Sequence, residues 1–182
     1  MAFLSIEPTA ADKRIANAIA RRTNPRIEKV AQLLTWGADE KLLLAVAIGG
    51  WLCASQEPAE RRLADHFLVI SLLSAILPHL LKKGVDQTRP DRLTVRGHWR
   101  GVPLSGRPRD VFPSGHAVHM GTLASAAGLL RAPTRQALRM LALALSVTRI
   151  VLLAHWTSDV VAGFALGAIV ERVTRRFTLR RR

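Results

Sequence analysis

Long apolar runs alternate with short connectors that are polar and rich in arginine. Five of these runs are long enough to form buried helices, and they cover residues 41–54, 67–81, 114–130, 137–154 and 158–173. No stretch of useful length alternates apolar and polar residues with the period of a β-strand. The pattern therefore predicts an all-α helical bundle, built as a single domain over residues 1–182.

A different pattern occupies residues 10–35. Apolar residues recur there at helical spacing among several basic residues, with a break at Asn24–Pro25. This pattern predicts one or two amphipathic helices lying in a membrane interface. A solvated amphipathic helix packed on the domain is the alternative.

Small residues recur at intervals of four in the second half of the chain. The pairs are Gly121 and Ser125, Ala124 and Gly128, and Gly163 and Gly167. Such spacing lets two helices approach closely inside lipid. We therefore expect close helix contacts at these positions.

Charge and apolar content are both high, and they are segregated. The chain has 182 residues, 49% of them hydrophobic, and a formal net charge of +14. A basic soluble nucleic-acid binder would instead mix its cations into amphipathic elements, so nucleic acid is not expected as a partner. We expect an integral-membrane bundle of about five spans. Because the runs fall short of the ~20 residues of a clean span, a buried all-helical core is the alternative.

Three clusters of polar residues lie at the ends of the apolar runs. They are Lys82, Arg89 and Pro90; Pro113, Ser114, Gly115 and His116; and Thr148, Arg149, His155 and Asp159. A chain that crosses a bilayer at each run returns to the same side after every second crossing. The clusters should therefore share one membrane face, or one end of the bundle if the runs are buried in protein.

The charges of these clusters suit an anion. Lys82, Arg89 and Arg149 supply three cations, and the amides at Ser114 and Gly115 fall at a helix N-terminus. The helix dipole favours negative charge there, and the arginine fork can hold two phosphate oxygens at once. A phosphate group fits this set.

Histidines complete the candidate site. Asp159 follows His155 by four residues, and a carboxylate that accepts a proton from one ring nitrogen leaves the other free to attack. His116 and His119, together with His155 and Asp159, could instead be read as a zinc site. The neighbouring cations would repel a metal ion, so we expect no metal and no cofactor.

Taken together, the three clusters resemble the type 2 phosphatidic acid phosphatase superfamily, which also includes vanadium-dependent haloperoxidases. The signature of that family is K-x6-RP, then PSGH, then SR-x5-H-x3-D, and the spacings within all three motifs match over residues 82–159. Thr148 stands where the family usually has serine. Lys83, next to Lys82, could serve in its place if the register slipped.

The resemblance implies a mechanism in two steps. His155, oriented by Asp159, attacks phosphorus and forms a phosphohistidine, and His116 protonates the departing oxygen before helping water to cleave the intermediate. The phosphoryl oxygens would be held by Lys82, Arg89, Ser114, the Gly115 amide and Arg149. No metal ion is needed in this scheme.

The resemblance also implies a small bacterial lipid phosphatase. Polyprenyl phosphates or diphosphates are the first candidate substrates, and phosphatidic acid and phosphatidylglycerol phosphate are the alternatives. A non-enzymatic protein that gathers anionic lipids would explain the cations, but not His116, His155 and Asp159 at motif spacing.

The expected location is a bacterial inner (plasma) membrane. Positive charge is nearly balanced between the two faces, but the arginine-rich tail over residues 175–182 favours a cytoplasmic C-terminus. An odd number of crossings then places the active site on the extracytoplasmic face.

Overall fold

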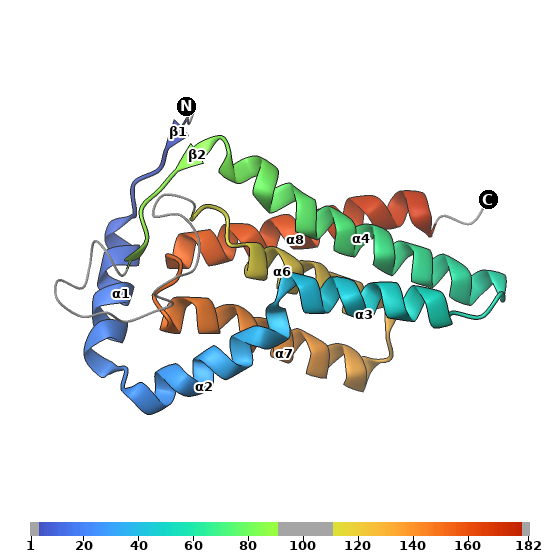
Figure 1. Ribbon diagram of the computed structural model, residues 1–182, viewed down its shortest axis with the longest axis horizontal. Coiled ribbons are helices and arrows are strands. Elements are labelled where there is room, and N and C mark those ends of the chain that lie inside the picture. Colours follow the sequence, from blue (N-terminus) through green and yellow to red (C-terminus); the bar gives the residue numbers. More distant parts are fainter. Residues whose placement is uncertain (1–3, 91–110, 180–182) are drawn as a thin grey trace.

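Helices dominate the computed structural model, which describes residues 4–90 and 111–179 (Figure 1). The helices are α1 Ala10–Arg22, α2 Pro25–Thr35, α3 Glu40–Cys53, α4 Pro58–Lys82, α6 Gly115–Ala126, α7 Ala132–Val151 and α8 Thr157–Thr178, with short 3-10 turns η1 Trp36–Ala38 and η2 Ala127–Leu129. Strands β1 Leu4–Ser5 and β2 Val85–Asp86 form a small parallel pair that the sequence did not suggest. The sequence also predicts a long irregular segment over residues 91–113, rich in Arg, Gly and Pro, and its residues 91–110 lie outside the described residues. The all-α prediction is confirmed.

Local sequence sets where the first helices begin. Thr9 and Asp12 form a reciprocal capping box at the start of α1. Asn24 caps α2, with Pro25 as the first helical residue, so the predicted break is the boundary between two helices. The Asp39 carboxylate caps α3 by accepting from the amides of Lys41 at 2.9 Å and Leu42 at 3.3 Å.

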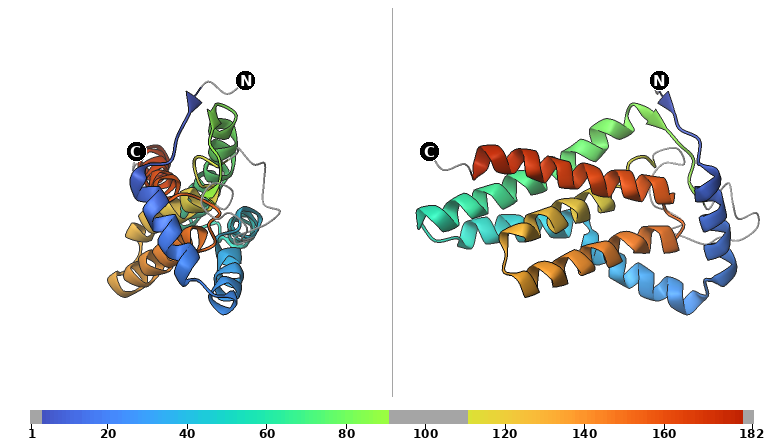
Figure 2. Two further views of the ribbon diagram at one scale, coloured as in Figure 1. Left: turned by 90° about the vertical axis from the view of Figure 1, so that its left-hand side faces the viewer. Right: turned by 180° about the vertical axis from the view of Figure 1, so that it is seen from behind.

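Helices α3, α4, α6, α7 and α8 run along an elongated bundle, whereas α1 crosses one end of it (Figures 1 and 2). This is the end at which α7 finishes and α8 starts. Helix α2 leads from α1 back along the bundle and packs against α7. The predicted amphipathic helices thus cover the end of the bundle that carries the three motifs.

The tightest helix contact joins α6 and α8. A Cβ atom on Gly121 would overlap the Phe164 carbonyl oxygen, and one on Gly167 would overlap the Val118 carbonyl oxygen. Backbone therefore packs directly on backbone at both positions, as the small-residue spacing predicts. This contact holds the start of α6 beside the start of α8.

Large apolar side chains point outward along much of the bundle. Val46 is 64% exposed, Met140 67%, Ile169 58% and Phe177 80%. An extended apolar exterior of this kind suits a lipid environment.

The helices match the five predicted apolar runs in position, but not all have the length of a membrane span. Among the described residues, only α4 is both long enough and apolar enough to qualify as a span by itself. Helices α3 and α6 have 14 and 12 residues, fewer than the ~20 that cross a bilayer without help. The positions of the helices therefore agree with the prediction of five spans. Within the described residues, one helix meets the length and hydropathy criteria of a span.

Candidate active site

The three predicted clusters meet at one end of the bundle, as the sequence pattern required. Lys82 is the last residue of α4, Ser114 is the N-cap of α6, and Arg149 lies in the last turn of α7. His155 falls in the connection between α7 and α8, and Asp159 is the third residue of α8.

Hydrogen bonds join the segment after α4 to the connection between α7 and α8. The Arg89 Nη1 donates to the Ala154 carbonyl at 3.1 Å. The Trp156 indole Nε1 donates to the Thr88 carbonyl at 2.7 Å, and the Ser114 amide donates to the Asp159 carbonyl at 3.3 Å. The site is thus held by backbone groups as well as by its charged side chains.

A tight turn places His155. The Ala154 amide bonds to the Arg149 carbonyl at 3.1 Å and the Leu153 amide to the Ile150 carbonyl at 3.0 Å, which is a Schellman motif at the end of α7. Leu153 has a φ of 51°, in the left-handed region that glycine usually occupies. Its buried side chain packs with Ala16 and Trp156. Packing therefore holds a backbone conformation that costs roughly 1–2 kcal/mol for a residue with a Cβ.

The side chains of His155 and Asp159 lie close to each other. The His155 Nδ1 lies 3.8 Å from the Asp159 Oδ2, and the two side chains are 4% and 0% exposed. The same Oδ2 accepts a hydrogen bond from the Trp156 amide at 2.9 Å. At 3.8 Å the pair is longer than a hydrogen bond, and contacts of this kind commonly tighten when substrate binds.

The surroundings of His155 favour the neutral imidazole. Burial is the main cause that lowers the pKa of His155 well below its ordinary value, and the nearby cations of Arg149, Arg89 and Lys82 lower the pKa further. A neutral ring is the form that can attack phosphorus.

Buried donors surround this ring. Arg89 and Arg149 are each 6% exposed, and Ser114 is fully buried. The Arg149 Nη1 donates to Thr35 Oγ1 at 3.3 Å. Its Nε and the Ser114 Oγ have no hydrogen-bond partner among the described residues. Buried donors of this kind are ordinarily satisfied, so the arrangement can receive an oxyanion.

Two details bear on motif positions that the sequence left open. Lys82 is half-buried and close enough to lower the pKa of His155, whereas Lys83 is exposed, which favours Lys82 as the phosphate contact. The Thr148 hydroxyl, at the position where the family usually has serine, donates to the Leu145 carbonyl at 2.6 Å. Serine could make the same bond.

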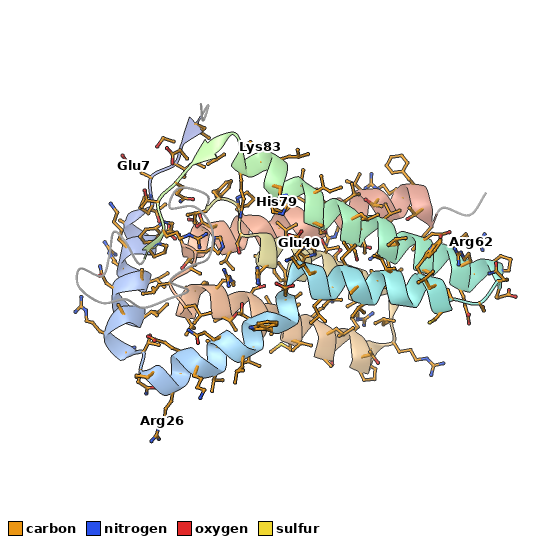
Figure 3. All side chains as sticks on the ribbon, viewed as in Figure 1. Glu7, Arg26, Glu40, Arg62, His79 and Lys83 are labelled. Carbon is orange, nitrogen blue, oxygen red and sulfur yellow. The ribbon has the colours of Figure 1, made fainter. Side chains whose placement is uncertain are left out.

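Two further histidines of the described residues, His79 and His119, lie outside the pair of His155 and Asp159. His79 Nε2 lies 3.1 Å from Glu40 Oε2 on the surface, and Figure 3 shows the two side chains pointing toward each other. His119 is buried beside an apolar cavity of about 290 Å³ between α3, α4 and α6. Within the described residues, no group of three or more His, Cys, Asp or Glu side chains is placed to hold a metal ion.

Sequence reasoning missed the part that the N-terminal helices play at this end. Asp12 of α1 accepts hydrogen bonds from the amide and hydroxyl of Ser158, both at 2.9 Å, and Thr35 of α2 contacts Arg149. The spacing of Thr9 and Asp12 is readable as a capping box, but nothing in the sequence points to their partner 146 residues later.

Comparison with known proteins places the motifs in a family. The PAP2 superfamily matches residues 64–182. The lipid A 1-phosphatases of Rhizobium johnstonii and Rhizobium etli are 38% and 37% identical to this chain over 104 residues. These matches cover 57% of this chain, and 43% and 45% of the length of those relatives.

Two solved structures share the fold. Aquifex aeolicus LpxE superposes with a TM-score of 0.76 at 19% identity, over 94% of this chain and 99% of that one. The first transmembrane PAP2 type phosphatidylglycerolphosphate phosphatase from Bacillus subtilis gives 0.65 at 20% identity, over 92% and 84%. Because the superfamily match spans more than half of the sequence and includes all three motifs, the chain belongs to the PAP2 superfamily that those motifs predicted.

Proposed function

We propose that this chain is a membrane phosphatase that hydrolyses a lipid phosphate ester through a phosphohistidine, without a metal ion. The observation that carries the proposal is the placement of His155 between Asp159 and a group of buried cations. A histidine in this setting is neutral and oriented, and it lies beside donors suited to phosphate oxygens.

In the first step the free Nε2 of His155 attacks phosphorus, and the bond from phosphorus to the lipid oxygen breaks. His116 gives its proton to the leaving oxygen. Asp159 keeps the Nδ1–H of the ring directed toward itself and stabilises the positive charge that the ring acquires.

In the second step water attacks the phosphohistidine. His116, now neutral, takes a proton from this water, the P–N bond breaks, and phosphate leaves with His155 restored. Lys82, Arg89, Arg149, the Ser114 hydroxyl and the Gly115 amide hold the phosphoryl oxygens while charge moves across them. Cations supplied by the chain itself do the work that a bound metal ion does in other phosphatases.

Several observations support a lipid as the substrate. The exterior of the bundle is apolar, and the cavity beside His119 is lined mostly by apolar residues of α3, α4 and α6. The sequence relatives are named for lipid A, which makes a phosphorylated glycolipid of that type a first candidate. Polyprenyl phosphates or diphosphates, phosphatidic acid and phosphatidylglycerol phosphate are the others.

We place the protein in the bacterial inner membrane, with α3, α4, α6, α7 and α8 crossing the bilayer and α1 and α2 at its interface. The arginine-rich C-terminal segment favours the cytoplasm, so the end that carries His155 faces outward.

Phosphate release by the purified protein in detergent tests this function. The panel contains lipid A, undecaprenyl phosphate and diphosphate, phosphatidic acid, phosphatidylglycerol phosphate and p-nitrophenyl phosphate, with His155→Ala as the blank. We expect release from one lipid class, little change in EDTA, and inhibition by vanadate, which imitates five-coordinate phosphorus.

Two results would overturn the proposal. Binding to anionic vesicles without phosphate release from any substrate would indicate a lipid-binding protein. Loss of activity in EDTA that zinc or magnesium restores would refute the metal-independent mechanism.

A further inference from the structure

Helix α8 begins without a capping side chain of its own. Its N-cap residue is Trp156, which makes no side-chain cap hydrogen bond. Ser, Thr, Asp or Asn usually occupies this position, and a side-chain oxygen there accepts from the second or third amide of the helix. In this chain the corresponding acceptor comes from α1.

Asp12 takes the place of the missing cap. Its Oδ1 accepts from the Ser158 amide at 2.9 Å, and Ser158 is the second residue of α8. Its Oδ2 accepts from the Ser158 hydroxyl at 2.9 Å. This is the bonding pattern of an N-cap, supplied by a residue on another helix.

Asp12 is itself firmly held. It is 3% exposed, and its Oδ2 also accepts from the Thr9 amide at 3.0 Å and the Thr9 hydroxyl at 2.7 Å. One turn later, Ala16 packs against Trp156 and Leu153. Helix α1 therefore brings the carboxylate to α8 as part of a packed contact.

The carboxylate is charged in this setting. Burial by itself would raise the pKa of Asp12, but the hydrogen bonds from Ser158 and Thr9 outweigh it and leave the pKa below its ordinary value. A negative charge at the start of α8 also interacts favourably with the helix dipole.

The cap lies one residue from the carboxylate that faces His155. Asp159 is the third residue of α8, and its Oδ2 both accepts from the Trp156 amide at 2.9 Å and lies 3.8 Å from His155 Nδ1. The first turn of α8 therefore decides where that oxygen stands relative to the ring.

We infer that Asp12 is a positioning residue: by capping α8 from α1, it fixes the first turn of that helix and so holds Asp159 against His155. The effect on turnover rests on the roles proposed above for Asp159 and His155. Asp12 itself touches no reacting atom.

The test compares Asp12→Ala, which removes the capping oxygens, with Asn24→Ala. Asn24 caps α2 in the same N-terminal region, is exposed, and its side chain accepts from the amides of Arg26 and Ile27. Three kinds of measurement are made on both variants in detergent: steady-state kinetics on p-nitrophenyl phosphate and on the preferred lipid, amide hydrogen exchange over residues 152–160, and thermal unfolding.

Asp12→Ala should lower kcat on the order of 10-fold and leave KM within about 2-fold, because small displacements of a catalytic group reduce turnover strongly. Exchange at the Ser158 amide should speed up. Asn24→Ala should leave both kcat and this exchange unchanged, even where it lowers the thermal midpoint. Ser158→Ala, which keeps the amide bond but loses the hydroxyl bond, should fall between them, and it serves as the second variant if Asp12→Ala does not fold.

Equal kcat in Asp12→Ala and wild type, with faster exchange, would reduce Asp12 to a structural role and overturn the inference. Unchanged exchange would show that the cap does not exist. A wild-type protein that releases no phosphate would refute the proposed function, and the exchange measurement would still decide whether Asp12 caps α8.

Discussion

The two ends of the bundle differ in how far their buried polar groups are satisfied by hydrogen bonds. At the end with His155, cations gather beside buried donors that have no partner among the described residues. At the other end lies a second buried polar group, which we call the distal network, formed by His66, Ser125, Glu171, Arg175 and Thr178. In Figure 3 this distal end is the one at which Arg62 is labelled.

The distal network satisfies its carboxylate completely. Glu171 is fully buried, and its Oε1 accepts from Arg175 Nε at 2.7 Å while Oε2 accepts from Ser125 Oγ at 2.6 Å. His66 Nε2 lies 3.2 Å from the same carboxylate, and its Nδ1 lies 2.7 Å from Thr178 Oγ1. These residues come from α4, α6 and α8, so the network ties three helices together.

This difference predicts that the distal end contributes to stability and that the end with His155 contributes to binding. Polar groups that bond to one another make the structure more rigid, because the loss of any one hydrogen bond leaves a buried polar or charged group without its partner. Polar groups left for a ligand contribute affinity and catalysis at the expense of stability. Substitutions at the two ends should therefore have opposite effects on activity and on unfolding.

The largest effect on activity is expected for His155→Ala. Removal of the nucleophile should lower turnover by at least about 10⁴-fold on every substrate, since no leaving group can replace the attacking atom. The thermal midpoint should fall less than in a variant that breaks the distal network, because the His155 Nδ1 has no hydrogen-bond partner among the described residues. Phosphate release and thermal unfolding in detergent measure both.

His116→Ala is the control for this variant. It should keep a larger fraction of its activity on p-nitrophenyl phosphate than on the lipid, because a good leaving group needs less general acid catalysis. If p-nitrophenyl phosphate restored activity to His155→Ala but not to His116→Ala, the roles of nucleophile and general acid would have to be exchanged between the two histidines.

Next in size is the cost of breaking the distal network. Glu171→Gln removes the charge that Arg175 faces. Because the Arg175 side chain is 31% exposed, we expect a loss of about 3 kcal/mol, at the lower end of the range for a buried ion pair. Unfolding in mixed detergent should show this loss, while kcat per folded molecule stays near wild type.

Glu40→Gln is the matched comparison, since Glu40 faces His79 on the exposed surface at 3.1 Å. It should leave stability nearly unchanged. A fall in kcat for Glu171→Gln, without a loss of folded protein, would mean that the two ends are coupled.

A smaller effect is expected for Arg149→Lys. Lysine keeps the charge but loses the fork that holds two oxygens, so turnover should fall on the order of 10²-fold. Arg139→Lys, on the same helix but bonded to the Ala124 carbonyl, should leave turnover unchanged. Wild-type kinetics in Arg149→Lys would assign Arg149 a purely structural role.

The smallest effect concerns pH. Because the pKa of His155 is lowered, its neutral form persists in acid, and protonation removes the nucleophile only below the ordinary histidine value of about 6.5. The acid limb of kcat/KM for p-nitrophenyl phosphate should therefore lie well below that pH. A limb centred near 6.5 would show that His155 is less buried, or less crowded by cations, than its contacts indicate.

Local patterns in the sequence predicted much of the fold. Apolar runs located α3, α4, α6, α7 and α8, and Asn24–Pro25 marked the boundary between α1 and α2. Each of these signals lies within the element that it specifies. The prediction was less accurate for the end of α6. The predicted run continued to residue 130, whereas α6 has 12 residues and is followed by the 3-10 turn η2.

The candidate site was predictable for a different reason. The spacing of Lys82 to Arg89, of Pro113 to His116 and of Arg149 to Asp159 lies within short segments, and the order of the apolar runs brings those segments to one end. Leu153 could not have been identified in this way. Its left-handed backbone is held by packing against Ala16 and Trp156, and no glycine marks the turn.

The sequence by itself determined which segments are helices, which motifs they carry and that these motifs meet at one end, because periodicity, caps and spacing are properties of neighbouring residues. Only the tertiary structure decided that Asp12 caps α8 and that Thr35 bonds to Arg149. Each of these contacts joins residues far apart in the chain. Their geometry depends on how whole helices pack, and the two hydrogen bonds leave no pattern among sequence neighbours.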